Sequence, residues 1–411
     1  MEDHVLNQPD KEILDFHGLW RTATNFFIRL GPVKNIVEKY FGDTIAFWNQ
    51  LVSHPDYDEY WKARTPLPHL KNITPAVLTV GGWYDAEDLY GPLKTYRAIE
   101  TQNSPDISNR LVMGPWSHGQ WNAGKAENLG NIFWGLDANE YFHELEYKFF
   151  SYYLTGEGDM DLAEATIFNT GTRKWMTYDQ WPPSNTDMRQ LYFQPEGGLS
   201  FEKPTNSEGF NEYVSDPMKP VPYQEDIHLR RTTQYMTGDQ RFASRRQDVL
   251  VYSSEILSEE ITFTGPLFAH LYVSTTGTDA DFIVKLIDVF PDLMPDYPQN
   301  SKDVPMGGYQ KLVRGEVMRG KYRNSFENPE PFIPGETAQV RFELQDVAHT
   351  FKKGHKIMIQ IQSSWFPLVD RNPQKFVDIY HCNEDDFQVA THRVYNNALY
   401  PSHIEVKVIK E

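Results

Sequence analysis

The sequence predicts a fold of class α/β plus all-β, in which a helical segment and an α/β region precede a longer β-rich region. Residues 1–66 carry apolar side chains at helical spacing and show no strand-like alternation. Residues 76–80 and 111–113 are short apolar runs separated by a helical pattern, as in a strand–helix–strand unit. From about residue 164, alternating apolar runs lie between Gly, Pro, Asn and Asp, which is typical of an antiparallel sandwich.

The amino-terminal segment is expected to be helical because five apolar residues fall on one helix face, after Gly31-Pro32 as a helix start. Those five are Val33, Ile36, Val37, Tyr40 and Phe41. The aromatic residues of the segment are interpreted as its core, and one or two of them lining a substrate pocket is the alternative. They are Trp20, Phe26, Phe27, Trp48 and Trp61.

The α/β region contains two expected strands with a helix between them. Residues 76–80 are bounded by Pro75 and Gly81-Gly82, which indicates a buried strand. Gly91-Pro92 opens the helix, because Pro is tolerated in a first turn. Gly114-Pro115 ends the second strand, and residues 139–154 form a closing helix.

Asp85 and His118 come just past the carboxyl ends of these two strands, where an open parallel sheet collects ligands and catalytic groups. An aspartate can hold a histidine in one tautomer and stabilise the imidazolium that forms during catalysis. Their order, with the aspartate 33 residues before the histidine, fits the second half of a Ser, Asp, His triad. The alternative is a pair of loop residues that never meet.

The β-rich region is predicted to hold eight strands and one long irregular loop at residues 203–248. The strands are expected at residues 165–169, 190–194, 249–253, 261–264, 269–274, 282–289, 340–344 and 356–361. Trp175, Trp181 and Trp365 are interpreted as core or interface residues. A sugar-binding platform is the alternative for them, because a sandwich alone does not define a function.

Composition excludes several classes of function. The net charge of −18 argues against nucleic acid or an anionic membrane surface as a partner, because both need a basic face. A single cysteine, Cys382, excludes a disulfide within the chain. No metal or phosphate motif occurs, so no cofactor is expected. Asp279, Asp281 and Asp288 could ligate calcium, and ordinary solvated loop acids are the alternative.

Several motifs, in the right order along nearly the whole chain, resemble one hydrolase family. They are the Gly-Gly-Trp-Tyr-Asp run ending at Asp85, the Gly-Pro-Trp-Ser-His-Gly run around His118, and residues 54–61, 351–357 and 363–367. The chain is similar to the CocE/NonD hydrolases, a group with cocaine esterase, α-amino-acid ester hydrolases, glutaryl acylases and Xaa-Pro dipeptidyl-peptidases. The resemblance implies that Asp85 orients His118, the base of a serine hydrolase that cleaves esters, amides or Xaa-Pro peptides.

The resemblance also implies three domains. Residues 1–66 would be the remnant of a helical cap, residues 67–160 the carboxy-terminal part of an α/β-hydrolase domain, and residues 161–411 a jelly-roll sandwich. In α-amino-acid ester hydrolases, carboxylates hold the ammonium group of the substrate, so Asp58 and Glu59 are candidate substrate-binding residues. Helix-start acids that complement the helix dipole are the alternative for this pair.

One departure from the family pattern is large. The family's nucleophilic serine lies on a Gly-x-Ser-x-Gly-like elbow far before its aspartate, and no such elbow occurs in this sequence. Ser117 adjoins His118 but lies on the wrong element for a nucleophile. The expectation is therefore a hydrolase portion that is inactive alone and is complemented by an amino-terminal hydrolase segment.

A non-catalytic protein whose jelly roll binds carbohydrate or a partner is the alternative function. The residues after Met1 lack the basic and apolar regions of a signal peptide, and export would need a preceding segment that carries one. Compartment and oligomeric state, including a homo-oligomer, are left open.

Overall fold

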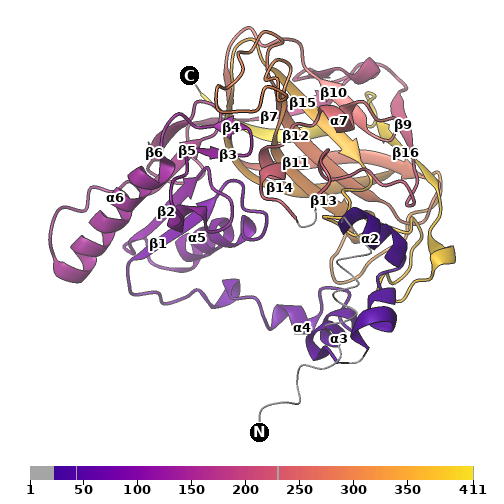
Figure 1. Cartoon of the computed structure of the whole chain (residues 1–411), viewed down its shortest axis with the longest axis horizontal. Helices are drawn as coiled ribbons and strands as arrows, with labels where there is room; N and C mark the ends of the chain where they lie inside the picture. The colour runs from indigo at the N-terminus through magenta and orange to yellow at the C-terminus, as the bar shows by residue number, and fades with distance from the viewer. Residues whose placement is uncertain (1–22, 43, 229–230, 411) are drawn as a thin grey trace.

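The computed structural model describes residues 23–42, 44–228 and 231–410, and it places a small α/β part beside a larger β part (Figure 1). Short helices of the amino-terminal segment lie below the β part in this view. They are α2 (Ala23–Leu30), the π-helical η1 (Val37–Phe41), α3 (Ala46–Val52), α4 (Glu59–Lys62) and the 3-10 turn η2 (Leu67–His69). In the described residues, no helix is long and apolar enough to cross a membrane.

The expected common apolar face of the amino-terminal segment is only partly right. Phe26 is buried, but Phe27 and Tyr40 are exposed and η1 has no buried residue. The segment contacts loops of the β part instead of forming its own core. For example, the Tyr57 amide donates to the Phe326 carbonyl at 2.9 Å. Trp20 lies outside the described residues.

The α/β part is a four-stranded sheet in the order β1-β2-β5-β6, with helices α5 and α6. Its elements are β1 (Val77–Gly82), α5 (Tyr90–Gln102), β2 (Asn109–Gly114), α6 (Ala138–Phe150) with the π-turn η4 (Ser151–Thr155), β5 (Ala165–Asn169) and β6 (Lys174–Tyr178). The first three strands are parallel and β6 is antiparallel. Predicting residues 165–169 as a sandwich strand was therefore wrong in its sheet, because β5 pairs with β2.

Strand β1 lies at the edge of this sheet and pairs only with β2 among the described residues. The amides of Val77 and Trp83 donate to the carbonyls of Ser108 and Gly114, so odd-numbered residues of β1 face β2. Leu78 and Val80 therefore point their backbone groups away from β2, and their side chains are half-buried. The outer edge of β1 is an open strand edge in the described part of the chain.

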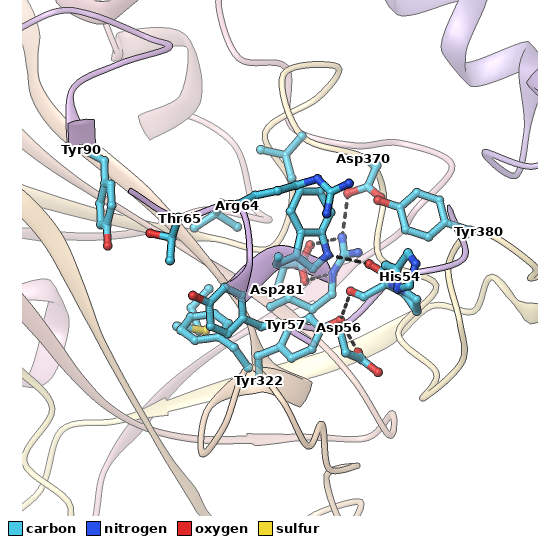
Figure 2. Close-up of a pocket in the computed structure, with 17 residues that line it drawn as sticks. His54, Asp56, Tyr57, Arg64, Thr65, Tyr90, Asp281, Tyr322, Asp370 and Tyr380 are labelled. Carbon is cyan, nitrogen blue, oxygen red and sulfur yellow. Dashed lines mark hydrogen bonds and ion pairs between the residues drawn. The ribbon is translucent and has the colours of Figure 1, made fainter. Parts of the chain in front are cut away.

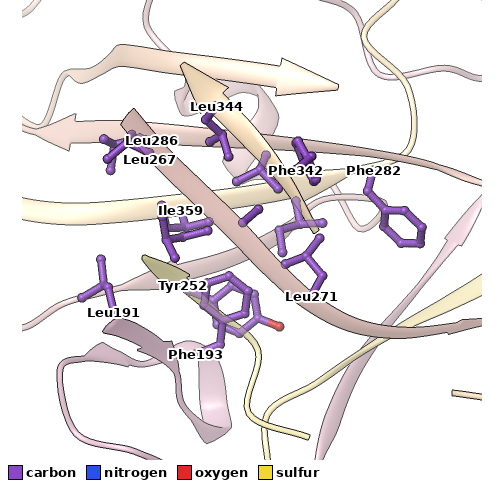
Figure 3. Close-up of a cluster of buried hydrophobic side chains, with 14 of the residues drawn as sticks. Leu191, Phe193, Tyr252, Leu267, Leu271, Phe282, Leu286, Phe342, Leu344 and Ile359 are labelled. Atoms are coloured by element: carbon purple, nitrogen blue, oxygen red, sulfur yellow. The ribbon is translucent and has the colours of Figure 1, made fainter. Parts of the chain in front are cut away.

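The β part is two antiparallel sheets that share one core. One sheet has the order β10-β15-β12-β13, and the other has the order β8-β7-β17-β11-β16-β9 with β14 on β11. Side chains from both sheets meet in this core, including Phe282 and Ile359 from the first and Leu271 and Leu344 from the second (Figure 3). The antiparallel prediction is confirmed, and the finer jelly-roll topology stays a prediction.

Most strands of the β part are longer than predicted, and the described residues contain more of them. They are β7 (Thr186–Phe193), β8 (Leu199–Ser200), β9 (Phe210–Ser215), β10 (Leu250–Ser253), β11 (Ile261–Thr275), β12 (Asp281–Val289), β13 (Gln310–Arg319), β14 (Ala338–Phe351), β15 (Lys356–Gln362), β16 (Ala390–Tyr395) and β17 (His403–Ile409). The runs at 261–264 and 269–274 are one bulged strand, β11. The loop predicted at 203–248 contains β9, which pairs with β16.

Short elements complete the chain: η3 (Gln120–Asn122), β3 (Asn128–Leu129), β4 (Ile132–Phe133), η5 (Pro195–Gly197), η6 (Gln234–Thr237), α7 (Arg241–Ser244), η7 (Gly320–Tyr322) and η8 (Glu384–Asp386).

The α/β part and the β part share a second hydrophobic core. Trp83, Leu93 and Leu111 from the first pack in one cluster with Phe290 and Tyr309 from the second. Ion pairs add to this junction, because helix α5 faces strand β14: Lys94 pairs with Glu343 at 2.8 Å, and Arg97 pairs with the buried Asp346. The sheet itself extends past residue 160 through β5 and β6, and the proposed domain boundaries stay predictions.

Candidate active site

Asp85 and His118 meet at the carboxyl ends of β1 and β2. His118 Nδ1 lies 3.1 Å from Asp85 Oδ2 and 3.3 Å from Asp85 Oδ1. Because a carboxylate only accepts, the contact fixes the proton on Nδ1 and leaves Nε2 as the basic nitrogen. The structure thus brings the predicted pair into the arrangement of an orienting acid and a general base.

Two glycines allow the loops after β1 and β2 to come this close. A Cβ on Gly82 would lie 2.3 Å from the carbonyl oxygen of Trp116, and one on Gly114 would lie 2.3 Å from the Trp116 ring. The Tyr84 amide donates to the same Trp116 carbonyl at 2.9 Å. The glycines of both motifs are therefore required by close packing of the loops that carry the pair.

The Asp85 carboxylate is held rigidly. Its side chain is 1% exposed, and Oδ1 accepts from the amides of Glu87 at 2.8 Å and Asp88 at 2.9 Å. These bonds close the turn between β1 and α5 over the carboxylate. The other carboxylate oxygen, Oδ2, is left to accept from His118 Nδ1.

His118 is the open member of the pair, with a side chain that is 47% exposed. The charge of Asp85 and its hydrogen bond raise the pKa of His118, and the carboxylates of Glu87 and Asp88 raise it further. Asp88 Oδ2 lies 3.5 Å from Nδ1. A base that is fixed in tautomer, raised in pKa and solvent-facing suits proton transfer to and from a bound group.

The same neighbourhood has the spacing of a cation site, but hydrogen bonding accounts for it. Among the described residues, Asp85, Asp88 and His118 are a group whose donor atoms lie within 4.8 Å of one another. Asp88 and His118 are solvent-facing, and Nδ1 is already used by Asp85. We assign no metal to this group.

Ser117 does not take the position of a nucleophile. It is buried, and its Oγ lies 3.3 Å from Gln120 Oε1. No hydrogen bond joins a serine hydroxyl to His118 in the described parts of the chain. The nucleophile that the pair would serve is therefore not found among the described residues.

Asp58 and Glu59 lie at the start of α4. Asp58 caps this helix by accepting from the Tyr60 amide at 2.9 Å, and it contacts His54 Nδ1 at 2.5 Å. Glu59 is 90% exposed and pairs with Lys62 at 3.2 Å. A substrate-binding role for the two residues stays a prediction.

A pocket of about 960 Å³ lies between residues 54–65 and the β part (Figure 2). Its wall is aromatic and acidic, with Trp61, Tyr322 and Tyr380 among the rings and Asp56, Asp281 and Asp370 as carboxylates; Tyr90, at the start of α5, also lines it. Neither Asp85 nor His118 lines the pocket.

Arg319 neutralises much of this acidity. Its guanidinium contacts Asp281 at 2.9 Å and Asp370 at 2.8 Å. Sequence patterns did not single out this group, because Arg319 and Asp281 are 38 residues apart on neighbouring strands.

The three aspartates considered for calcium are buried and occupied, so describing them as solvated loop acids was wrong. Asp279 and Asp281 accept from Asn372 Nδ2 at 3.1 and 2.7 Å. Asp288 accepts from His349 and His355 at 3.1 and 2.7 Å. Each carboxylate has protein donors in place of an ion.

Family models match most of the chain. Residues 158–405 match the X-Pro dipeptidyl-peptidase C-terminal non-catalytic domain, and residues 22–120 match the X-Pro dipeptidyl-peptidase S15 family. The chain belongs to the CocE/NonD and X-Pro dipeptidyl-peptidase S15 family. The predicted resemblance is thus confirmed, and the chain combines part of a hydrolase domain with the family's C-terminal domain.

Individual curated proteins share sequence with the chain. Cocaine esterase from Rhodococcus sp. is 30% identical over 88% of this chain and 61% of its own length. A putative serine esterase of Mycobacterium tuberculosis is 23% identical over 82% of this chain and 50% of its own length. The chain therefore spans between half and two thirds of these relatives.

Solved structures agree with this assignment. An aminopeptidase from a marine sediment Thaumarchaeota archaeon superposes with a TM-score of 0.90 at 36% identity, over 95% of this chain and 64% of that chain. An α-amino acid ester hydrolase gives 0.89 at 34% identity, over 95% and 65%. A Staphylococcus aureus CocE/NonD hydrolase at 14% identity and a TM-score of 0.59 shares the fold.

Proposed function

We propose that this chain supplies the acid, Asp85, and the base, His118, of a serine hydrolase whose nucleophile comes from polypeptide beyond these 411 residues. The observation that carries the proposal is the Asp85–His118 contact of 3.1 Å at the ends of two parallel strands. The lack of a Gly-x-Ser-x-Gly elbow supports the second half of the proposal. So does the chain's coverage of 61% of cocaine esterase.

The proposed reaction is acyl transfer to water from an ester, an amide or an Xaa-Pro peptide. His118 Nε2 takes the proton of the serine hydroxyl as the serine oxygen bonds to the substrate carbonyl carbon. The imidazolium then protonates the leaving alcohol or amine as its bond to that carbon breaks. Water repeats the sequence on the acyl-enzyme, with His118 again the base. Asp85 keeps Nδ1–H oriented and stabilises the imidazolium through both stages.

The complementing segment would dock beside β1. The outer edge of β1 offers the unpaired backbone groups of Leu78 and Val80, which is how a strand from another polypeptide is recruited. Exposed aromatic side chains of α6, such as Tyr147 at 72% and Phe150 at 47% exposure, give the α/β part a further apolar surface for such a segment. In the proposed complex, the added strand runs parallel to β1, so that the serine elbow at its carboxyl end lies at the same end of the sheet as His118.

For substrates, we propose a small acyl ester, amide or peptide, as the relatives' names suggest for those proteins. Asp58 and Glu59 are the proposed ammonium-binding residues. A direct test compares Asp58→Asn and Glu59→Gln on paired substrates with and without an α-amino group. A selective rise in KM for the amino substrate would support the assignment.

The function is tested by complementation. The purified chain is assayed on a nitrophenyl acetate alone and after co-expression with the part of the thaumarchaeal aminopeptidase that it does not cover. We expect the chain alone to match its His118→Ala variant and the complemented complex to turn over. General-base assistance is worth roughly 10²–10⁴-fold only once nucleophile and oxyanion donors are placed.

Controls separate the components. In the complex, His118→Ala and Asp85→Asn should each abolish most turnover, whereas Ser117→Ala should leave it intact. Robust turnover by the chain alone that depends on Ser117 would contradict the proposed nucleophile. Turnover of the complex that ignores both Asp85 and His118 would contradict the proposed acid and base.

A further inference from the structure

One arginine of the β part donates a hydrogen bond to the turn that carries Asp85. Arg314 lies on β13, and its Nη1 donates to the carbonyl oxygen of Trp83 at 2.9 Å. Trp83 stands two residues before Asp85, at the point where β1 turns toward α5. The bond therefore joins the C-terminal domain to the backbone of the turn that carries the proposed catalytic acid.

Arg314 is unusual for a buried cation. It is 3% exposed, it makes no ion pair within 4.0 Å among the described residues, and its Nε has no hydrogen-bond partner there. Burial lowers the pKa of its guanidinium to about 10, so the group is still charged at neutral pH. The carboxylates of Asp346 and Glu316 partly offset this effect of burial, although neither makes an ion pair with Arg314. A buried charge that is incompletely paired disfavours the fold, and such groups are concentrated at functional sites.

Other contacts fix the side chains of this turn, so that the bond to Arg314 acts on its backbone. Trp83 Nε1 donates to the Phe168 carbonyl at 2.8 Å, and the Tyr84 ring stacks on Trp134 with centroids 5.8 Å apart. These contacts hold the two aromatic side chains to the α/β part. The carbonyl that Arg314 holds sets the direction of the peptide plane between Trp83 and Tyr84, and hence the path of the chain into Asp85.

We propose that Arg314 is a positioning residue: it fixes the Trp83 carbonyl so that the turn holds the Asp85 carboxylate against His118 Nδ1. The importance of this positioning for catalysis rests on the proposed function. On this view, the domain that the family model describes as non-catalytic holds the catalytic acid in place. A charged donor to a peptide carbonyl is stronger and more directional than a neutral one, which suits this task.

The test reads the Asp85–His118 pair directly, through the pKa of His118 from an NMR titration of its ring signals in the intact chain. Three carboxylates face His118, those of Asp85, Glu87 and Asp88, and Arg231 pairs with Glu87. The Asp85→Asn variant shows how far the His118 pKa falls when the charge of Asp85, the largest of the three effects, is lost completely. We expect Arg314→Met to lower the His118 pKa by about half of the Asp85→Asn shift or more, because a displaced carboxylate interacts more weakly.

The matched control is Lys285→Met. Lys285 is an equally buried base on the neighbouring strand β12, and its Nζ donates to Gln240 at 3.0 Å rather than to the Asp85 turn. Lys285→Met should leave the His118 pKa unchanged, which separates a local effect at the Asp85 turn from the general loss of a buried basic side chain. Global destabilisation does not move the pKa of a group in the molecules that remain folded, so a purely structural role would leave this readout unchanged.

Arg314→Lys makes the test decisive if the methionine variant does not fold. Lysine keeps the charge but is a shorter donor without the planar fork. A lowered His118 pKa in either folded variant supports the proposal. An unchanged His118 pKa in every variant that folds overturns it. The titration does not need turnover, so an inactive complemented complex would count against the proposed function while leaving this result readable.

Discussion

At the scale of single residues, Lys285 and Lys311 are buried bases that make no ion pair within the described part of the chain, although Asp288 lies opposite Lys311 in the sheet. Lys285 Nζ donates to Gln240 at 3.0 Å, and Lys311 Nζ donates to the Thr170 carbonyl at 3.0 Å. Burial lowers the pKa of each to about 7. In the unfolded chain a lysine titrates near 10.4, so the unfolded state binds more protons between these values.

This difference predicts that the free energy of unfolding rises between pH 7 and pH 9. Stability increases with pH wherever the unfolded state binds more protons, and one such lysine contributes ~2 kcal/mol over this interval. Lys285→Met should remove its share of the rise. Urea unfolding of both proteins at pH 7, 8 and 9 checks this; parallel pH profiles would mean that Lys285 titrates normally in the fold.

Sequence reasoning found the residues whose meaning is local and missed those whose partners are distant. The contact between Asp85 and His118 could be predicted because each residue follows a recognisable strand inside a compact motif. Arg314 could not, since its partner Trp83 is 231 residues away along the chain. Asp288 shows the same limit, because the histidines that occupy it are 61 and 67 residues distant.

At the scale of elements, the open edge of β1 distinguishes two neighbouring residues. The amide of Thr79 faces β2, whereas that of Val80 faces outward. Proline lacks the amide proton and is tolerated on the free side of an edge strand.

Val80→Pro should therefore leave the isolated chain folded but weaken the complemented activity, because it blocks strand addition. Thr79→Pro should instead destabilise the chain itself by roughly 1–3 kcal/mol, the cost of an unpaired buried backbone group. Thermal unfolding and the nitrophenyl acetate assay read the two effects separately. Full complementation by Val80→Pro would place the docking site elsewhere.

Helices and strands were predictable where one periodicity governs them. The helix near Gly91-Pro92 and the strands around residues 76–80 and 111–113 were confirmed within a few residues as α5, β1 and β2. Strand β13 was missed because the buried Lys311 and Arg314 interrupt its apolar pattern. Strand β5 was placed in the wrong sheet because a local pattern does not reveal which strand becomes its partner.

At the scale of the whole molecule, the shared core between the two parts predicts a single cooperative unfolding transition. Phe290 and Tyr309 from the β part and Trp83 and Leu93 from the α/β part lie in one buried cluster. Neither part can lose its structure without exposing apolar surface of the other. Calorimetry of the chain should show one peak, and two separated peaks would contradict this.

Asp346 probes the same coupling. Its carboxylate is fully buried and accepts from Trp181 Nε1 at 2.7 Å while pairing with Arg97 of α5. Asp346→Asn removes the charge partner of Arg97 and should cost roughly 1–3 kcal/mol. The whole transition should move to lower temperature. A new early transition confined to the α/β part would show that the junction is weaker than its contacts indicate.

The bond between Arg314 and Trp83 also has a consequence for chimaeras built from two members of this family. The match to the S15 family ends at residue 120, and the match to the C-terminal domain begins at residue 158. The segment between them is therefore a natural place to join two parents in a chimaera. A chimaera joined there inherits the turn of the acid from one parent and the arginine that holds it from the other. Successful recombinants should therefore come from parents that carry the same arginine and the same turn, and the two halves should change together during divergence.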